Sequence, residues 1–245
     1  MSTASSEFVI DVDGRDRAVH VHVHPRAKLL RLRYDPVADA LKLVVPPRAS
    51  MRSARAWTLA QTDWIRRQIA QAPAPSWVAP AVAIPWDGAT LLIDWAADRP
   101  RAPALVTADD DWVLHIGGPQ CGVGARVGRW LKDFARADFT ERTHRLAAQA
   151  GLRCVGVSVG DPRSRWGSCT AQGRIRYSWR IAMAPTFVRE ALAGHEVAHL
   201  AHMNHGPDFH ALVASLVGAQ ADASRLWLRQ HGRALHDWRF SRPLD

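Results

Sequence analysis

The sequence predicts an α+β protein, with a strand-rich N-terminal half followed by a helix-rich C-terminal half. Residues 7–46 alternate apolar and polar side chains with the period of a β-strand, most clearly in the run V-H-V-H-V-H at 19–24. In the second half, apolar side chains instead recur with the spacing of helix faces. The Gly-Gly-Pro sequence at 117–119 ends the first half, so we expect a strand-rich N-terminal region with one helix at 1–120 and a second domain at 121–245.

Short strands and a single helix make up the expected N-terminal region. The helix runs from about Ser53 to Gln71, and Pro46 and Pro47 separate it from the strands before it. Prolines among alanines mark 72–85 as a linker, and no internal repeat is evident. The expected strands are 19–24, 29–34, 41–45, 89–95, 104–107 and 112–116.

Helices dominate the expected second domain. Gly151 is suited to end the first helix, because glycine adopts the left-handed conformation that commonly closes a helix. Pro207 suits the first turn of the third helix, where its missing N–H costs nothing. A strand pair, 154–159 and 174–181, is expected between the first and second helices. The expected helices are 125–150, 185–203, 207–217 and 223–235.

The composition is that of an ordinary globular protein. The chain is 47% hydrophobic and 22% charged, which excludes an intrinsically disordered protein. No apolar run approaches the ~20 residues needed to span a bilayer, so we expect no membrane partner. The first residues lack the basic and apolar regions of a secretion signal, and the three cysteines form no C-x-x-C pair. These features favour a reducing compartment, and we expect a cytoplasmic protein.

The run H-E-V-A-H at 195–199 is the most informative stretch of the chain. His195 and His199 stand four residues apart on the expected helix, so both imidazoles point the same way and can bind one Zn²⁺. Glu196, beside the first histidine, is placed to act as general base on a zinc-bound water. The sequence therefore predicts a zinc site with a base next to it.

A third zinc ligand is expected from the turn that follows this helix. Asn204 and Gly206 tolerate positive φ angles, so the chain can turn sharply and fold His205 back onto the metal. His202 is the competing ligand, but its Cα should lie about 10 Å along the helix axis from that of His195, which is far for a shared ion. Three histidine ligands leave a fourth position open, as a catalytic zinc requires.

An excess of basic residues is a second feature that bears on function. The chain holds 32 lysines and arginines against 23 aspartates and glutamates, for a formal net charge of +9. A basic surface attracts nucleic acid or acidic partners, so nucleic acid is a possible partner. His20, His22 and His24 share one strand face, but no carboxylate or cysteine accompanies them, which favours an exposed face over a metal site.

Two motifs carry a resemblance to a known family. The sequence 195–209 resembles the signature of YgjP-like metallopeptidases, which are relatives of SprT-like zinc proteases, and R-W-G-S-C at 165–169 resembles that family's second hallmark. The resemblance implies a zincin-like metallopeptidase domain with an H-E-x-x-H active-site helix. It implies that Glu196 is the general base, and that the zinc ligands are His195, His199 and His205.

Peptide-bond hydrolysis is the function that these observations predict. Zn²⁺ would lower the pKa of a bound water, Glu196 would take its proton, and the hydroxide would attack the carbonyl of a polypeptide substrate. An edge strand within 165–181 could pair with that substrate, and the residues considered for stabilising the oxyanion are Arg165, Tyr177 and Arg180. The SprT-like relatives make a DNA-bound protein a possible partner.

Two other functions fit the same motif. One is a zinc amidase for small substrates, with Cys169 in place of His205 as the third ligand. The other is a non-catalytic zinc module that binds nucleic acid or protein through its arginine-rich surface, which predicts a closed coordination shell without water. The physiological metal is also open, since Mn²⁺ or Co²⁺ could occupy the same ligands.

Overall fold

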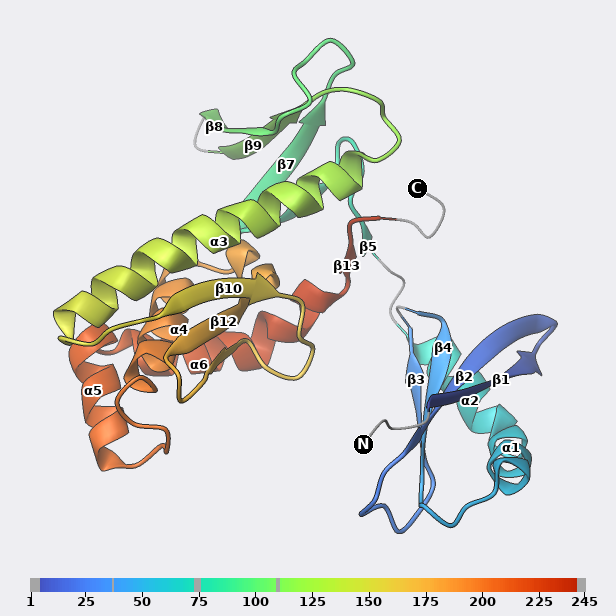
Figure 1. Ribbon diagram of the computed structural model, residues 1–245. Helices are drawn as coiled ribbons and strands as arrows, with labels where there is room; N and C mark the ends of the chain where they lie inside the picture. Colours follow the sequence, from blue (N-terminus) through green and yellow to red (C-terminus); the bar gives the residue numbers. More distant parts are fainter. Residues whose placement is uncertain (1–4, 37, 73–75, 109–110, 242–245) are drawn as a thin grey trace. The chain divides into compact units, whose positions relative to one another are not determined.

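The computed structural model describes residues 5–36, 38–72, 76–108 and 111–241 (Figure 1). The predicted α+β architecture is confirmed, with strands concentrated in the N-terminal half and helices in the C-terminal part. The chain forms two compact units, Met1–Pro75 and Ser76–Asp245, whereas a boundary at 120 was expected. The strands between residues 76 and 116 thus belong to the same unit as the C-terminal helices, whereas those before residue 46 belong to the first unit. Residues 73–75 of the expected linker lie outside the described part of the chain.

The first unit is a four-stranded sheet with two helices. The order across the sheet is β1-β2-β4-β3, in which β2 and β4 run parallel and the outer pairs are antiparallel. Ala54 and Ile65 of the helices join the buried face of the sheet. The elements are β1 (Ser5–Val12), β2 (Arg15–Val23), β3 (Arg31–Asp35), β4 (Ala40–Val45), α1 (Met51–Leu59) and α2 (Thr62–Gln71).

The helix expected at 53–71 is divided into α1 and α2. The Thr62 hydroxyl donates to the Leu59 carbonyl oxygen at 2.5 Å, which occupies an acceptor that a continuous helix would use for a backbone N–H. At the other end, the Ser50 hydroxyl oxygen accepts from the Ser53 N–H at 3.1 Å and begins α1. Local side-chain hydrogen bonds therefore set these helix boundaries.

A second four-stranded sheet repeats the topology of the first. Its order is β6-β7-β9-β8, with the middle pair parallel and the outer pairs antiparallel. The hairpin turns Asp13-Gly14 and Asp87-Gly88 both have positive φ angles at aspartate and glycine, as a tight two-residue hairpin requires. The expectation of no internal repeat was therefore wrong at the level of structure. The strands are β6 (Ala83–Trp86), β7 (Ala89–Trp95), β8 (Ala104–Ala108) and β9 (Asp111–Ile116).

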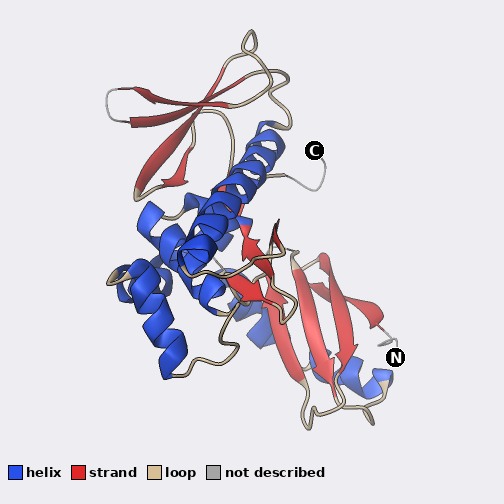
Figure 2. Ribbon diagram, turned by 60° about the vertical axis from the view of Figure 1, so that its left-hand side comes forward, coloured by secondary structure: helices blue, strands red, loops and turns tan. Residues whose placement is uncertain are grey.

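The rest of the second unit is built around α3 (Val123–Gln149). In Figures 1 and 2, this helix runs between the second sheet and the part of the unit that holds the shorter helices. Within the described residues, no helix combines the length and apolar character needed to cross a membrane. The other elements are β5 (Ser76–Trp77), β10 (Gly156–Gly160), β11 (Gly167–Cys169), β12 (Arg174–Ser178), the 3₁₀ turn Trp179–Met183, α4 (Thr186–Ala198), α5 (Pro207–Val217), α6 (Gln220–His231), the 3₁₀ turn Gly232–His236 and β13 (Trp238–Arg239).

Helix α4, which carries H-E-x-x-H, is held firmly within this unit. It packs against α3, α5, α6 and β11. At its start, the Asp87 carboxylate in the β6–β7 turn accepts hydrogen bonds from the Thr186 N–H and hydroxyl. Arg189, which is 4% exposed, pairs with Asp138 of α3 at 3.1 Å. The orientation of α4 is thus fixed by a sheet turn and a long helix that are distant in sequence.

Candidate metal centre

Three histidines converge at the C-terminal end of α4. His195, His199 and His205 each offer a ring nitrogen, and these nitrogens lie within 4.8 Å of one another. The three ring centroids are 4.8 to 5.2 Å apart. The Nε2 atoms of His195 and His205 are 3.4 Å apart, close to the roughly 3.3 Å that separates two nitrogen ligands on one tetrahedral zinc. The structure therefore brings together the three ligands expected from the sequence.

The turn that places His205 begins earlier than expected. Helix α4 ends at Ala198, whereas the sequence predicted a helix to about 203, and the Leu200 and Ala201 N–H groups close tighter turns. The His199 Nδ1 atom lies 3.0 Å from the His202 carbonyl oxygen. Because a carbonyl oxygen only accepts, Nδ1 carries the proton and Nε2 keeps its lone pair for a metal. His202 thus supports the candidate ligand His199 through its backbone.

Phe209 lies beneath all three histidine rings. Its ring centroid is 5.0 Å from that of His195 and 4.6 Å from those of His199 and His205, and the side chain is fully buried. A rigid aromatic contact of this kind restricts the orientation of each imidazole. The sequence analysis missed this role, although the position of Phe209 in the first turn after Pro207 signalled a side chain near His205.

The protonation states of the histidines also suit a metal. Burial, together with the nearby His199 and His205, lowers the pKa of His195 to about 4. Burial also lowers the pKa of His199, against the hydrogen bond to the His202 backbone. Neutral imidazoles are the form that binds metal, so His195 and His199 are in the form that binds a divalent cation near neutral pH. His205 is exposed, which leaves one side of the cluster open to solvent.

Glu196 is buried next to this cluster, and one of its carboxylate oxygens makes no hydrogen bond within the described part of the chain. Glu196 is 4% exposed, and the oxygen atom without a hydrogen bond among the described residues is Oε2. Burial raises the pKa of Glu196 to about 8, and Arg165 opposes this shift. A native protein rarely keeps an unsatisfied buried carboxylate, and a divalent cation held beside it would favour the ionised form.

Gly167 lets the backbone of β11 approach Glu196 closely. A Cβ atom at residue 167 would lie 2.3 Å from Oε1 and 2.8 Å from Cγ of Glu196. Such distances are shorter than van der Waals contact, so only glycine permits this arrangement. This contact gives a physical role to the glycine of the R-W-G-S-C segment, for which the sequence analysis had none.

We expect Gly167→Ala to displace Glu196 and to destabilise the protein by about 1 to 3 kcal/mol through overpacking. Gly156→Ala in the same sheet is the matched control, because a Cβ atom there meets nothing within 4 Å. Thermal unfolding measures the difference in stability between the two variants. Equal melting temperatures for the two variants would contradict the close contact.

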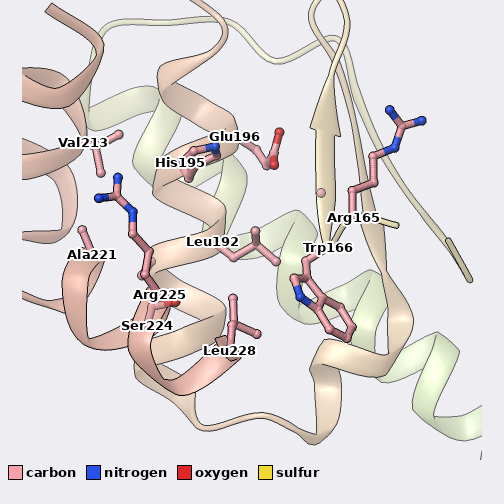
Figure 3. A pocket seen from close by; sticks show the side chains of 12 residues that line it. Arg165, Trp166, Leu192, His195, Glu196, Val213, Ala221, Ser224, Arg225 and Leu228 are labelled. Atoms are coloured by element: carbon pink, nitrogen blue, oxygen red, sulfur yellow. The ribbon is translucent and has the colours of Figure 1, made fainter. Parts of the chain in front are cut away.

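A pocket of about 270 Å³ opens directly beside His195 and Glu196 (Figure 3). Most of its exposed wall is apolar, and among the described residues Glu196 is the only carboxylate that lines it. Trp166 closes one side, where its ring stacks on His236 at 4.8 Å. The lining residues are Arg165, Trp166, Gly167, Ala191, Leu192, His195, Glu196, Val213, Ala221, Ser224, Arg225 and Leu228.

Two of the three residues considered for the oxyanion are engaged elsewhere. Tyr177 is fully buried and its hydroxyl is 2.9 Å from that of Thr143. Arg180 binds Asp161 and the carbonyl oxygens of the C-terminal segment, so it has a structural role. Arg165 alone of the three lines the pocket with Glu196.

The comparison with known families agrees with this geometry. An α+β fold in which a helix and the following turn present three converging histidines and a neighbouring glutamate defines a metallopeptidase-type domain. The family model of the YgjP-like metallopeptidase domain matches residues 28–231, so the chain belongs to the YgjP-like metallopeptidase family. This match confirms the resemblance found in the sequence. No curated protein and no solved structure matches the chain.

Proposed function

We propose that the protein is a zinc-dependent metallopeptidase in which His195, His199 and His205 hold the metal and Glu196 is the general base. The observation that carries this proposal is the buried carboxylate of Glu196, whose Oε2 has no hydrogen-bond partner among the described residues, next to three converging imidazoles. Neutral imidazole nitrogens at this spacing suit Zn²⁺. The exposed side of the cluster gives substrate a path to it.

Zinc bound by these histidines would act as a Lewis acid that acidifies water and polarises a peptide carbonyl. Glu196 accepts one proton from the attacking water, whose oxygen forms the new bond to the carbonyl carbon. The same carboxyl group then returns this proton to the peptide nitrogen as the C–N bond breaks. Gly167 packs closely against Glu196 and would keep it in place for both transfers, and the positive charge of Arg165 favours its ionised form.

Strand β11 offers the substrate a binding edge. It lies at the edge of the three-stranded sheet β10-β12-β11 and packs against α4. An extended polypeptide can add to such an edge by backbone hydrogen bonds, largely independent of its sequence. Because Gly167 of β11 contacts Glu196, a peptide paired there would run past the base.

The pocket beside Glu196 would then receive a large apolar side chain next to the scissile bond. We expect Ala221→Leu, which fills this pocket, to lower cleavage of such substrates about tenfold or more, since the side chain loses its burial. Peptides with a small residue at that position should be cleaved as before. Ala223→Leu, on the exposed side of α6, is the control and should change neither rate. Equal losses for both peptide classes would contradict the pocket assignment.

Incubation of the zinc-loaded protein with an unfolded polypeptide tests the proposed function. Mass spectrometry of the products should show new peptide termini that disappear when the metal is chelated and return when zinc is restored. If intact polypeptide remains in the presence of stoichiometric zinc, the peptidase assignment is wrong.

A further inference from the structure

The first unit has one sheet face that no described helix covers. Helices α1 and α2 bury the face that holds the core of this unit, whereas the opposite face is exposed (Figure 1). Its exposed side chains differ in charge between the two sides of the sheet. Toward β3 they are Arg31 and Arg33 of β3, Lys42 of β4, and His20 and His22 of β2, whereas toward β1 they are Glu7, Val9 and Asp11 of β1 and Asp16 of β2.

The strand register places these side chains side by side. Arg33 lies opposite Lys42 on the neighbouring strand, and Lys42 lies opposite His20. Directly opposed residues have Cβ atoms about 5 Å apart, so these three side chains are neighbours. Beyond His20 the row ends on Glu7 of β1, which lies opposite His20 and pairs with it at 3.3 Å. Lys42 is paired with Asp35 at 2.8 Å, but Arg31 and Arg33 make no ion pair with any described residue. Their guanidinium groups are therefore available to a partner.

A hollow of about 490 Å³ continues this surface at the end of β3. No acidic residue lines it, and Arg31 and Val44 connect it to the sheet face. Arg26 and Lys28 add two further cations, which have no ion-pair partner among the described residues. We refer to Arg26, Lys28, Arg31, Arg33 and Lys42 together as the basic face.

The second sheet provides a comparison within the same chain. His20 and Asp94 stand at equivalent places, each six residues after the glycine of its hairpin turn. In the second sheet the corresponding row is Ala104, His115 and Asp94, and Asp94 pairs with His115 at 2.9 Å. In the second sheet, the residues at the equivalent positions thus have almost no net charge. The strand topology itself therefore does not require the cations of the basic face.

We propose that the basic face binds the phosphate backbone of a nucleic acid. Arginine forks bind phosphate oxygens in pairs, and several cations without ion-pair partners on one surface suit a repeating polyanion. A protein partner is less well matched, because interface cores are rich in apolar side chains and poor in lysine. A membrane surface would need apolar anchors, and Leu29, at 73% exposure, is the one large apolar side chain in the hollow. The inference does not depend on the proposed peptidase activity.

Fluorescence anisotropy with short labelled DNA and RNA duplexes tests this inference on the full-length chain. We expect binding that weakens with salt, and Arg31→Glu/Arg33→Glu should lower affinity about tenfold or more. The slope of log affinity against log salt should fall by about 2, since two phosphate contacts are lost. The matched control, Arg52→Glu/Arg67→Glu, makes the same charge change on the helices and should leave affinity within about twofold.

Three results would overturn the proposal. The first is no binding of either duplex at low salt. The second is an equal loss in both double variants, which would mean that net charge alone attracts the nucleic acid. The third is binding to anionic lipid vesicles or to polyglutamate, but not to the duplexes, that depends on Arg31 and Arg33. Circular dichroism of each variant verifies that the fold is retained.

Discussion

Glu196→Gln is expected to abolish peptide hydrolysis while leaving metal binding intact. Glutamine keeps the shape of the side chain but cannot accept the proton of the attacking water, so kcat/KM should fall at least about 10³-fold, as for loss of a general base. Glu196 is not one of the three converging ligands, so the zinc content should stay at one per chain. Peptide cleavage rates together with elemental analysis measure both effects. Full activity in this variant would refute the role of Glu196.

Glu190→Gln is the matched control on the same helix. Glu190 lies on α4 but binds Arg142 and Arg145, away from the histidines. Its replacement should cost stability through the lost ion pairs and leave the cleavage rate near that of the wild type. The two substitutions therefore separate the chemistry of Glu196 from a general loss of a carboxylate on this helix.

The convergence of the three histidines was predictable because most of its determinants are local. His195 and His199 share a helix face by their spacing, and the Asn204–Pro207 sequence signals a turn that returns His205. The length of the helix was not predictable from the periodicity. The turn starts at His199, where the side chain donates to the His202 carbonyl oxygen instead of pointing away from the following chain. A competing local hydrogen bond thus overrode the helical pattern.

The features that the sequence did not reveal depend on contacts between distant segments. Gly167 approaches Glu196 across the space between β11 and α4, and Asp87 begins α4 from a hairpin turn almost 100 residues earlier. The repeat of the four-stranded sheet is not evident in the sequence for a related reason. Its two copies share strand order and an Asp-Gly turn, whereas their side chains differ in charge and size. Strand pairing constrains periodicity and turns, but allows the exposed residues to diverge.

His205→Ala should weaken zinc binding by more than about 100-fold, whereas Cys169→Ser should leave it unchanged. The first substitution removes one of three converging nitrogens, and the remaining two cannot hold the ion firmly. Cys169 is not part of the cluster, and burial, together with Glu196 and Cys154, raises the pKa of its thiol to about 11. Competition with a chromogenic chelator measures both affinities.

A large loss of zinc affinity in Cys169→Ser and none in His205→Ala would favour the small-substrate amidase, in which Cys169 is the third ligand. The geometry argues against that result, because the Nε2 atoms of His205 and His195 are already 3.4 Å apart. The ligands of the bound metal distinguish a peptidase from the other alternative, a non-catalytic zinc module. X-ray absorption of the zinc-loaded protein should show three imidazole nitrogens and one light-atom ligand from solvent, which Glu196→Gln leaves in place. A shell closed by four protein side chains would instead indicate a structural zinc, and Glu196 would then have no water to activate.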